Sequence, residues 1–183
     1  MDIHFASLLV ILFRLVVPFS IFRWPLGGAV AAMVADASDV MIAQRFGYGY
    51  LDMFGANTYH NIDKILDIYY LFFELIVASR WTNIYARRTA TVLFVWRAAG
   101  AALFEVTRVR WLFLAAPNIF ENFYLAWTII LKWFRRFKFT TYKLIIILLL
   151  VGIPKIVQEY LMHYVYVDQT WNFLRDTLFW WLY

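Results

Sequence analysis

Four aspartates at helical spacings are the residues of this chain best suited to chemistry. Asp36 and Asp39 are three residues apart, and Asp63 and Asp67 are four apart. Such spacings place each pair on one face of a helix. Carboxylate oxygens are the preferred ligands of hard divalent cations, and two cations sharing bridging carboxylates would balance four negative charges. The pattern therefore predicts a site for two hard divalent cations such as Mg²⁺, Mn²⁺ or Ca²⁺.

The helices that position these aspartates must be strongly apolar. Of the 183 residues, 64% are hydrophobic and 21% aromatic, and the mean hydropathy is +0.65. This composition is outside the range of soluble globular domains, and at about 20 residues per span the chain has room for roughly six spans. We expect an all-α fold, a polytopic membrane helix bundle of about six transmembrane helices that forms a single transmembrane domain over residues 1–183.

Apolar segments separated by short polar or basic stretches define the expected spans. They cover about 5–22, 26–42, 62–80, 88–105, 111–131 and 142–164. The polar stretch 44–61 reads as a loop or short interfacial segment, and Pro154 is expected to kink the last span. Aromatic and apolar residues are mixed with Arg175 and Asp176 over 168–183, which favours an interfacial amphipathic helix. The absence of cysteine excludes disulfides and thiolate-held metals, and the net charge of +5 suits anionic lipid headgroups better than nucleic acid.

Charges inside these spans need partners. A carboxylate near lipid costs on the order of 2.5 to 3.5 kcal/mol, so the aspartate cluster requires a positive group unless each aspartate is separately solvated at the interface. Arg14 lies deep in the first span, four residues before Pro18, where it can pair with an aspartate or hold a substrate phosphate. Interhelical ion pairs, such as one between Arg97 and Glu121, are the simplest expectation for the remaining intramembrane charges, which also include Glu105, Lys155 and Glu159.

The aspartate pattern resembles the motif of the CDP-alcohol phosphatidyltransferase family. That motif, D-x2-D-G-x2-A-R-x8or9-G-x3-D-x3-D, extends from the end of the second of six transmembrane helices to the start of the third. Here Asp36-Ala37-Ser38-Asp39 with Ala43 is similar to its first half, and Asp63-Lys64-Ile65-Leu66-Asp67 is similar to its last part. The match is divergent, because Val40 replaces the motif glycine, Gln44 replaces the arginine, and the second pair comes about six residues late. An alternative register places Tyr59 and Asp63 at the last two acidic positions.

The resemblance implies a metal-dependent phosphotransferase of phospholipid synthesis. Such an enzyme moves a phospho-alcohol group from a CDP-linked, or other diphosphate or lipid, donor to an alcohol acceptor. The implied ligands of two Mg²⁺ or Mn²⁺ ions are Asp36, Asp39, Asp63 and Asp67, and Asp67 would also be the general base. Arg14, Ala43 and Lys64 would contact substrate, and the implied partners are a lipid substrate, the membrane and a second copy of the chain.

The membrane orientation and the function class stay open. Basic residues gather in the expected loops opposite the aspartates, so the positive-inside rule places the site away from the cytoplasm, whereas the family keeps it cytoplasmic. An intramembrane prenyl transferase would also use aspartate-rich motifs, but it needs about nine helices. The main alternative is a non-enzymatic small membrane transporter or ion-binding protein with a carboxylate cluster.

Overall fold

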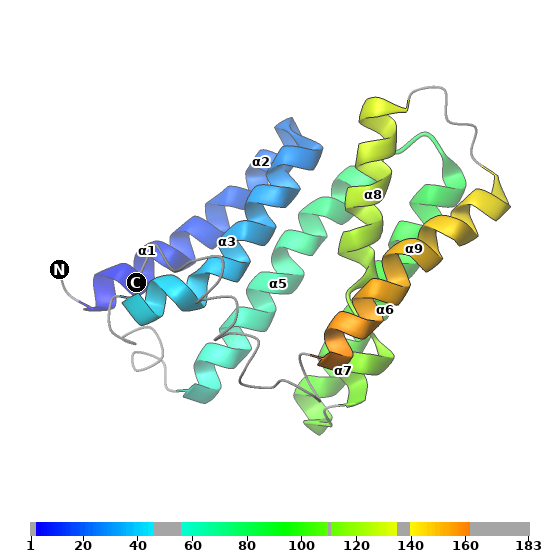
Figure 1. The fold of residues 1–183 in the computed structure, drawn as a ribbon. Helices are drawn as coiled ribbons and strands as arrows, with labels where there is room; N and C mark the ends of the chain where they lie inside the picture. The colour runs from blue at the N-terminus through cyan, green and yellow to red at the C-terminus, as the bar shows by residue number, and fades with distance from the viewer. Residues whose placement is uncertain (1–2, 46–55, 110, 135–139, 162–183) are drawn as a thin grey trace. The chain divides into compact units, whose positions relative to one another are not determined.

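The structure is a computed structural model that describes residues 3–45, 56–109, 111–134 and 140–161. Every regular element within these ranges is a helix, so the prediction of an all-α fold is confirmed there (Figure 1). The chain divides into two compact units, residues 1–70 with 168–183 and residues 71–167. The expectation of one transmembrane domain over residues 1–183 stays a prediction, and the amphipathic helix expected at 168–183 lies outside the described residues.

The first unit begins with a helical run that contains a short 3₁₀ turn. α1 (Ile3–Val16) leads into the turn η1 (Val17–Phe19) and then into α2 (Ser20–Arg23). Pro18 lies at the start of η1 and has no backbone N–H, so the α-helical hydrogen-bond pattern is interrupted there. The span expected at 5–22 is therefore helical but not one regular α-helix.

Two further helices complete the described part of this unit. α3 (Pro25–Arg45) starts with a proline, which is favoured in the first turn of a helix, and returns alongside α1 and α2 (Figure 1). α5 (Ala56–Ala78) contributes its residues up to Tyr70. The stretch 44–61 is expected to be a loop or a short interfacial segment, but α3 continues to Arg45 and α5 already starts at Ala56, so a loop is wrong for both of its ends. Helix covers polar residues there that the sequence pattern assigned to a loop.

A glycine permits the close approach of α2 and α3. A Cβ atom built on Gly28 would lie 2.6 Å from the Cα atom of Ile21, which has no exposed surface. Ala29 and Ala32 are also buried on α3. Small residues of this kind allow two helix backbones to approach each other closely.

The described part of the second unit contains the remainder of α5 and four more helices. These are α6 (Ile84–Thr107), α7 (Trp111–Ala115), α8 (Ile119–Trp133) and α9 (Thr141–Tyr160). α8 packs against α6 and α9, and it supplies the buried aromatic residues Phe120, Phe123, Tyr124 and Trp127. Side chains that accept hydrogen bonds from backbone amides cap α6, α8 and α9, namely Asn83, Asn118 and Thr140.

The fifth expected span, residues 111–131, is not one helix. It is divided into α7 and α8 at Ala116, Pro117 and Asn118. Proline cannot continue the hydrogen-bond ladder of a preceding helix, and Asn118 caps the next one through the amide of Glu121 at 3.4 Å. Pro154 does lie inside α9, and the kink expected there stays a prediction.

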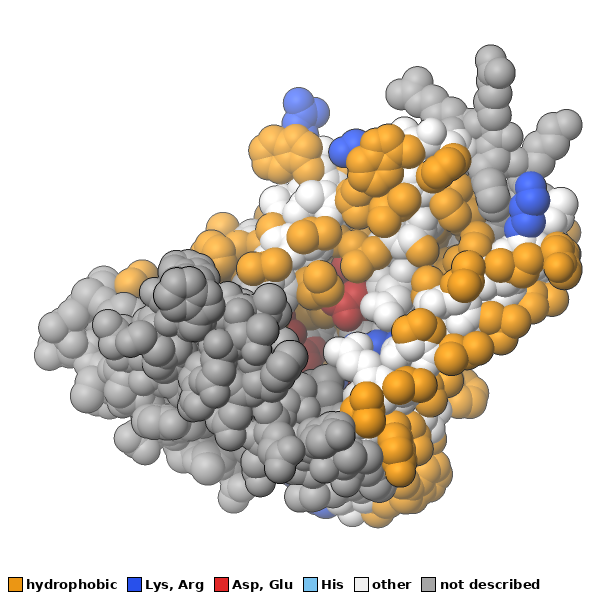
Figure 2. Space-filling view, viewed as in Figure 1, with side chains coloured by type: hydrophobic (Ala, Val, Ile, Leu, Met, Phe, Trp, Pro, Cys, Tyr) orange, Lys and Arg blue, Asp and Glu red, His pale blue; other side chains and the backbone are white. Residues whose placement is uncertain are grey.

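Two described helices, α6 and α9, are long and apolar enough to cross a membrane. Only 6% of the apolar window of α6 and 11% of that of α9 is buried, unlike the core helix of a soluble protein. Figure 2 shows hydrophobic side chains over much of the visible surface of the described residues. Exposed apolar surface on this scale is unfavourable in water and is typical of contact with lipid or with another apolar surface.

Substitution of Gly28 by alanine should destabilise the first unit. The new methyl group would overlap the backbone of α2, and overpacking of this kind costs about 1 to 3 kcal/mol. Gly27→Ala is the matched control, because its Cβ would meet only the Trp24 Cβ atom at 3.8 Å. We expect Gly27→Ala to be neutral or stabilising, since alanine favours helix by roughly 1 kcal/mol. Thermal unfolding in detergent measures both, and equal melting temperatures would contradict the close approach.

Candidate functional site: a charged cluster on three helices

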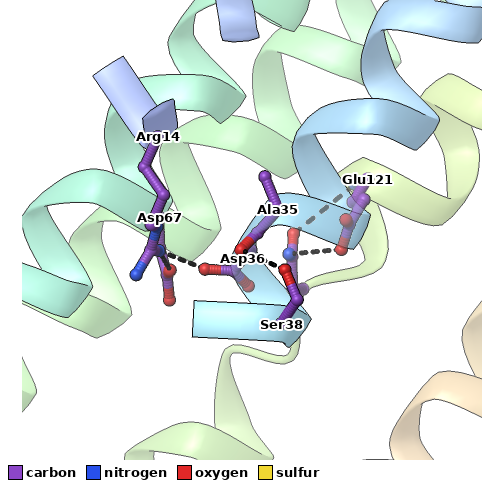
Figure 3. Close-up of polar contacts among 7 residues, drawn as sticks. Arg14, Ala35, Asp36, Ser38, Asp67 and Glu121 are labelled. Atoms are coloured by element: carbon purple, nitrogen blue, oxygen red, sulfur yellow. Dashed lines mark hydrogen bonds and ion pairs between the residues drawn. The ribbon is translucent and has the colours of Figure 1, made fainter. Parts of the chain in front are cut away.

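Arg14 joins three helices of the first unit. Its side chain lies in the last turn of α1 and is 3% exposed. Its Nη2 atom donates hydrogen bonds to Oδ1 of Asp36 in α3 and, at 2.9 Å, to Oδ1 of Asp67 in α5 (Figure 3). We call Arg14, Asp36 and Asp67 the Arg14 cluster.

Contacts of neighbouring residues on α3 and α5 orient the side chains of the Arg14 cluster. On α3, Ala32 and Ala35 are buried, which turns the face that carries Asp36 toward the packed side of the helix. On α5, Leu66 and Tyr70 are buried on either side of Asp67. The hydroxyl group of Tyr69 donates to the backbone oxygen of Leu15 at 3.1 Å, which ties α5 to α1 directly beside Arg14. The cluster therefore depends on apolar packing as well as on charge.

The structure brings two of the predicted site residues together, and the site itself stays a prediction. Both aspartate pairs lie within helices, α3 and α5, so their spacing of three and four residues is helical as predicted. Asp36 and Asp67, from different pairs, meet at one guanidinium group. The side chains of Asp39, Asp63 and Ala43 lie outside the described part of the structure, and Lys64 is half-buried on α5.

The charges of the cluster are partly balanced. One guanidinium faces two carboxylates, each of which is 29% exposed. Arginine is suited to this position because its planar group carries several donors and stays protonated. Among the residues whose side chains are described, no group of three or more histidine or acidic residues could hold a metal ion. Asp36 and Asp67 nevertheless supply oxygen donors of the kind that hard cations prefer.

Glu74 is a buried carboxyl group that is not among the charged residues singled out from the sequence. It lies in the part of α5 that belongs to the second unit and has no exposed surface. Neither of its carboxyl oxygens has a hydrogen-bond partner within the described ranges. Its signal in the sequence is a single acidic residue inside the apolar run 71–77, and an ionisable residue in such a run is a candidate functional residue by default.

Two α6 side chains, one of them Arg97, reach the break between α7 and α8. The indole nitrogen of Trp96 donates to the backbone oxygen of Ala115 at 2.9 Å, and Nη1 of Arg97 donates to that of Ala116 at 3.1 Å. Gly100 leaves space there for Ala116, because a Cβ atom on this glycine would overlap the Cβ atom of Ala116. The sequence pattern does not indicate that Arg97 donates a hydrogen bond to the backbone at this helix break.

Glu105 and Glu159 each form an ion pair with a residue near in sequence, and the interhelical pairs expected from the sequence stay a prediction. Glu105 pairs with Arg108 at 2.9 Å, three residues along the chain. Glu159 pairs with Lys155 at 3.5 Å, four residues along the same helix. Side chains three or four residues apart in a helix are neighbours on its surface, so these pairs need no second helix.

No protein-family model, curated protein or solved structure matches the chain. The resemblance to CDP-alcohol phosphatidyltransferases therefore rests on the spacing of the aspartates and on Ala43. Both features belong to the first unit.

Removal of the Arg14 charge should destabilise the first unit. We expect Arg14→Met to lower the free energy of unfolding by on the order of 3 kcal/mol, near the lower end for a broken buried ion pair, because the aspartates are partly exposed. Denaturant titration in mixed micelles measures this change. The control is Arg23→Met, which changes an exposed arginine and should stay within about 0.5 kcal/mol of wild type. Addition of Asp67→Asn to Arg14→Met should restore part of the loss, and strict additivity would contradict the ion pair.

Proposed function

We propose that the chain is a multi-pass membrane protein with about six spans and that the Arg14 cluster is part of a metal-dependent phosphotransferase site. The mostly exposed apolar helices α6 and α9 support the membrane part of the proposal. The enzymatic part is supported chiefly by one observation: Asp36 and Asp67, from separate halves of the aspartate pattern, converge on one arginine. A chance distribution of interfacial aspartates would not require such convergence.

The proposed cofactor is a pair of Mg²⁺ or Mn²⁺ ions held by Asp36, Asp39, Asp63 and Asp67. Carboxylates that project from two helices are suitable oxygen donors for such ions. When bound, the ions would stabilise negative charge on the phosphoryl oxygens of the donor and on its leaving phosphate. The site would be closed to softer metals, which prefer thiolate ligands that this chain lacks.

Protein side chains would carry out the proton transfer and bind the donor phosphate. Asp67 would accept the proton of the acceptor hydroxyl group as this oxygen attacks phosphorus. Arg14 would bind a phosphate oxygen of the donor, and half-buried Lys64 would add positive charge beside Asp67. The small side chain of Ala43 would leave room for the donor. The reaction would transfer a phospho-alcohol group from a CDP-linked, or other diphosphate or lipid, donor to an alcohol acceptor in phospholipid synthesis.

The proposed surroundings follow from this activity. A lipid substrate requires a site accessible from the membrane, and a second copy of the chain is the proposed protein partner. Of the two carboxylates described in the cluster, both keep 29% of their side-chain surface exposed, so they are accessible in the first unit taken by itself. The side of the membrane that the site faces stays open.

A second candidate function is supported by Arg14 itself. Its guanidinium already neutralises much of the charge on Asp36 and Asp67, so these helices can pack without a metal ion. On this alternative, the chain is a non-enzymatic transporter or ion-binding protein, and the Arg14 cluster stabilises its helices. The two functions differ in whether divalent cations stabilise the protein through Asp67.

Membrane integration can be tested separately from activity. We expect the full chain, expressed in cells, to stay in the membrane pellet after extraction with alkaline carbonate, because burial of the apolar faces of α6 and α9 in lipid does not depend on charge. A non-ionic detergent should release it. Release by carbonate alone would contradict integration.

Thermal stability with metal and donor tests the phosphotransferase. We expect Mg²⁺ or Mn²⁺ to raise the melting temperature of the purified chain, with stabilisation of about 2.7 kcal/mol at a concentration 100-fold above the dissociation constant. CDP-diacylglycerol should raise it further. Asp36→Asn and Asp67→Asn should remove both effects, while Glu105→Gln, in the second unit, should keep them.

Each outcome of this experiment separates the two candidate functions. Metal stabilisation without an effect of CDP-diacylglycerol would retain the metal site but require another donor. A melting temperature that responds to neither Mg²⁺ nor Mn²⁺ would rule out the metal-dependent enzyme and favour the alternative.

A further inference from the structure

Glu74 is in an environment that strongly disfavours a charge. Its side chain is completely buried, and within the described part of the second unit neither carboxyl oxygen accepts or donates a hydrogen bond. An ionised carboxylate transferred to such surroundings without a partner is far more costly than a neutral carboxylic acid. The side chain therefore needs a positive partner that the described residues do not supply, or a proton of its own.

The titratable groups that act on Glu74 come from α8. Glu121 and Tyr124 are close enough for electrostatic interaction with it, and neither carries a positive charge. On α6, the Nη1 atom of Arg97 is engaged by the backbone oxygen of Ala116. On α9, Lys155 is paired with Glu159. The described electrostatic surroundings of Glu74 thus favour its neutral form.

Glu121 is the better place for the negative charge of this pair. It lies in the first turn of α8, where the exposed backbone amides and the helix dipole stabilise an anion. Its Oε2 atom also accepts a hydrogen bond from Nδ2 of Asn118 at 2.9 Å. Two carboxyl groups in such different environments divide their roles, one ionised and the other protonated.

The tight packing around Glu74 limits the size of any ligand that this side chain could bind. Zero exposure means that no void as large as a water molecule adjoins the side chain. Tyr124, which interacts electrostatically with Glu74, stacks on Trp81 with ring centres 5.6 Å apart. A metal ion with its coordination shell, or an organic ammonium group, would have to displace the atoms that enclose Glu74. A proton needs no additional space.

We propose that Glu74 is a proton-binding site of the second unit, a neutral carboxylic acid in the folded protein that is held beside an ionised Glu121. Unfolding of the unit in detergent solution exposes Glu74 to water and releases the proton. This site is independent of the proposed phosphotransferase, because it lies in the other unit and requires no metal.

The proposal determines how stability depends on pH. An unfolded glutamate has lost its proton above a pKa of about 4.3, so folding takes up one proton whenever the pH is higher and Glu74 stays neutral. Because the folded state then binds more protons than the unfolded state, stability falls as the pH rises. The contribution of this site to the folding equilibrium constant should decrease by about tenfold per pH unit over that range.

Infrared spectroscopy detects the proton directly. The full chain would be purified in a maltoside detergent, which has no carbonyl group, and its absorption compared at neutral pH for wild type and Glu74→Gln. We expect the carbonyl stretching band of a protonated carboxylic acid in wild type, reduced in Glu74→Gln and unchanged in the control Glu105→Gln, whose side chain is 32% exposed. Absence of the band in wild type, or equal intensity in Glu74→Gln, would overturn the proposal.

Unfolding as a function of pH provides a second measurement. Glutamine has nearly the shape of a protonated glutamate, so Glu74→Gln should fold and should lack the proton uptake. We expect wild type to lose stability relative to Glu74→Gln as the pH is raised, with the same result in sodium, potassium and choline chloride. Parallel pH profiles would overturn the proposal, and so would stabilisation of wild type by Na⁺ or K⁺ that is lost in Glu74→Gln, because the ligand would then be a metal cation.

Discussion

The bonds from Arg14 to Asp36 and Asp67 are the interaction on which the described part of the first unit most depends. Apolar helices can slide or rotate against one another at little cost, because one hydrophobic contact resembles the next. A buried guanidinium group with two carboxylates has far fewer acceptable geometries, since each unpaired charge is expensive. The ion triad thus fixes the rotation of α1, α3 and α5, and the small residues of α3 then allow the backbones to approach closely.

The two units accommodate ionisable side chains in different ways. In the first, opposite charges from different helices meet where the carboxylates keep some contact with the surroundings. In the second, Glu121 accepts a hydrogen bond from Asn118 at its own helix cap, Glu159 pairs with Lys155 on the same helix, and Glu74 is completely buried. The first arrangement leaves carboxylate oxygens accessible for chemistry, whereas burial removes Glu74 from contact with ligands larger than a proton.

Sequence patterns predicted the features that depend on residues close together in the chain. Apolar segments gave the helices, and the spacing of Asp36 and Asp67 within their pairs indicated the faces that converge. The predictions failed for features that depend on contacts between residues far apart in the sequence. Helix α5 starts at Ala56 although its first turns are polar, a pattern that by itself favours a loop. Burial of Glu74 also depends on α8, far along the chain, so a window of local sequence could show an isolated acid but not its surroundings.

The break between α7 and α8 has a consequence for the biogenesis of the second unit. Carbonyl groups at a helix break need hydrogen-bond donors from elsewhere, and here Trp96 and Arg97 of α6 supply donors for Ala115 and Ala116. Helix α6 precedes the break in the chain and is synthesised first. The donors of Trp96 and Arg97 are therefore already synthesised when α7 and α8 are made. The carbonyl groups at the break can bond to them as soon as the two helices pack against α6.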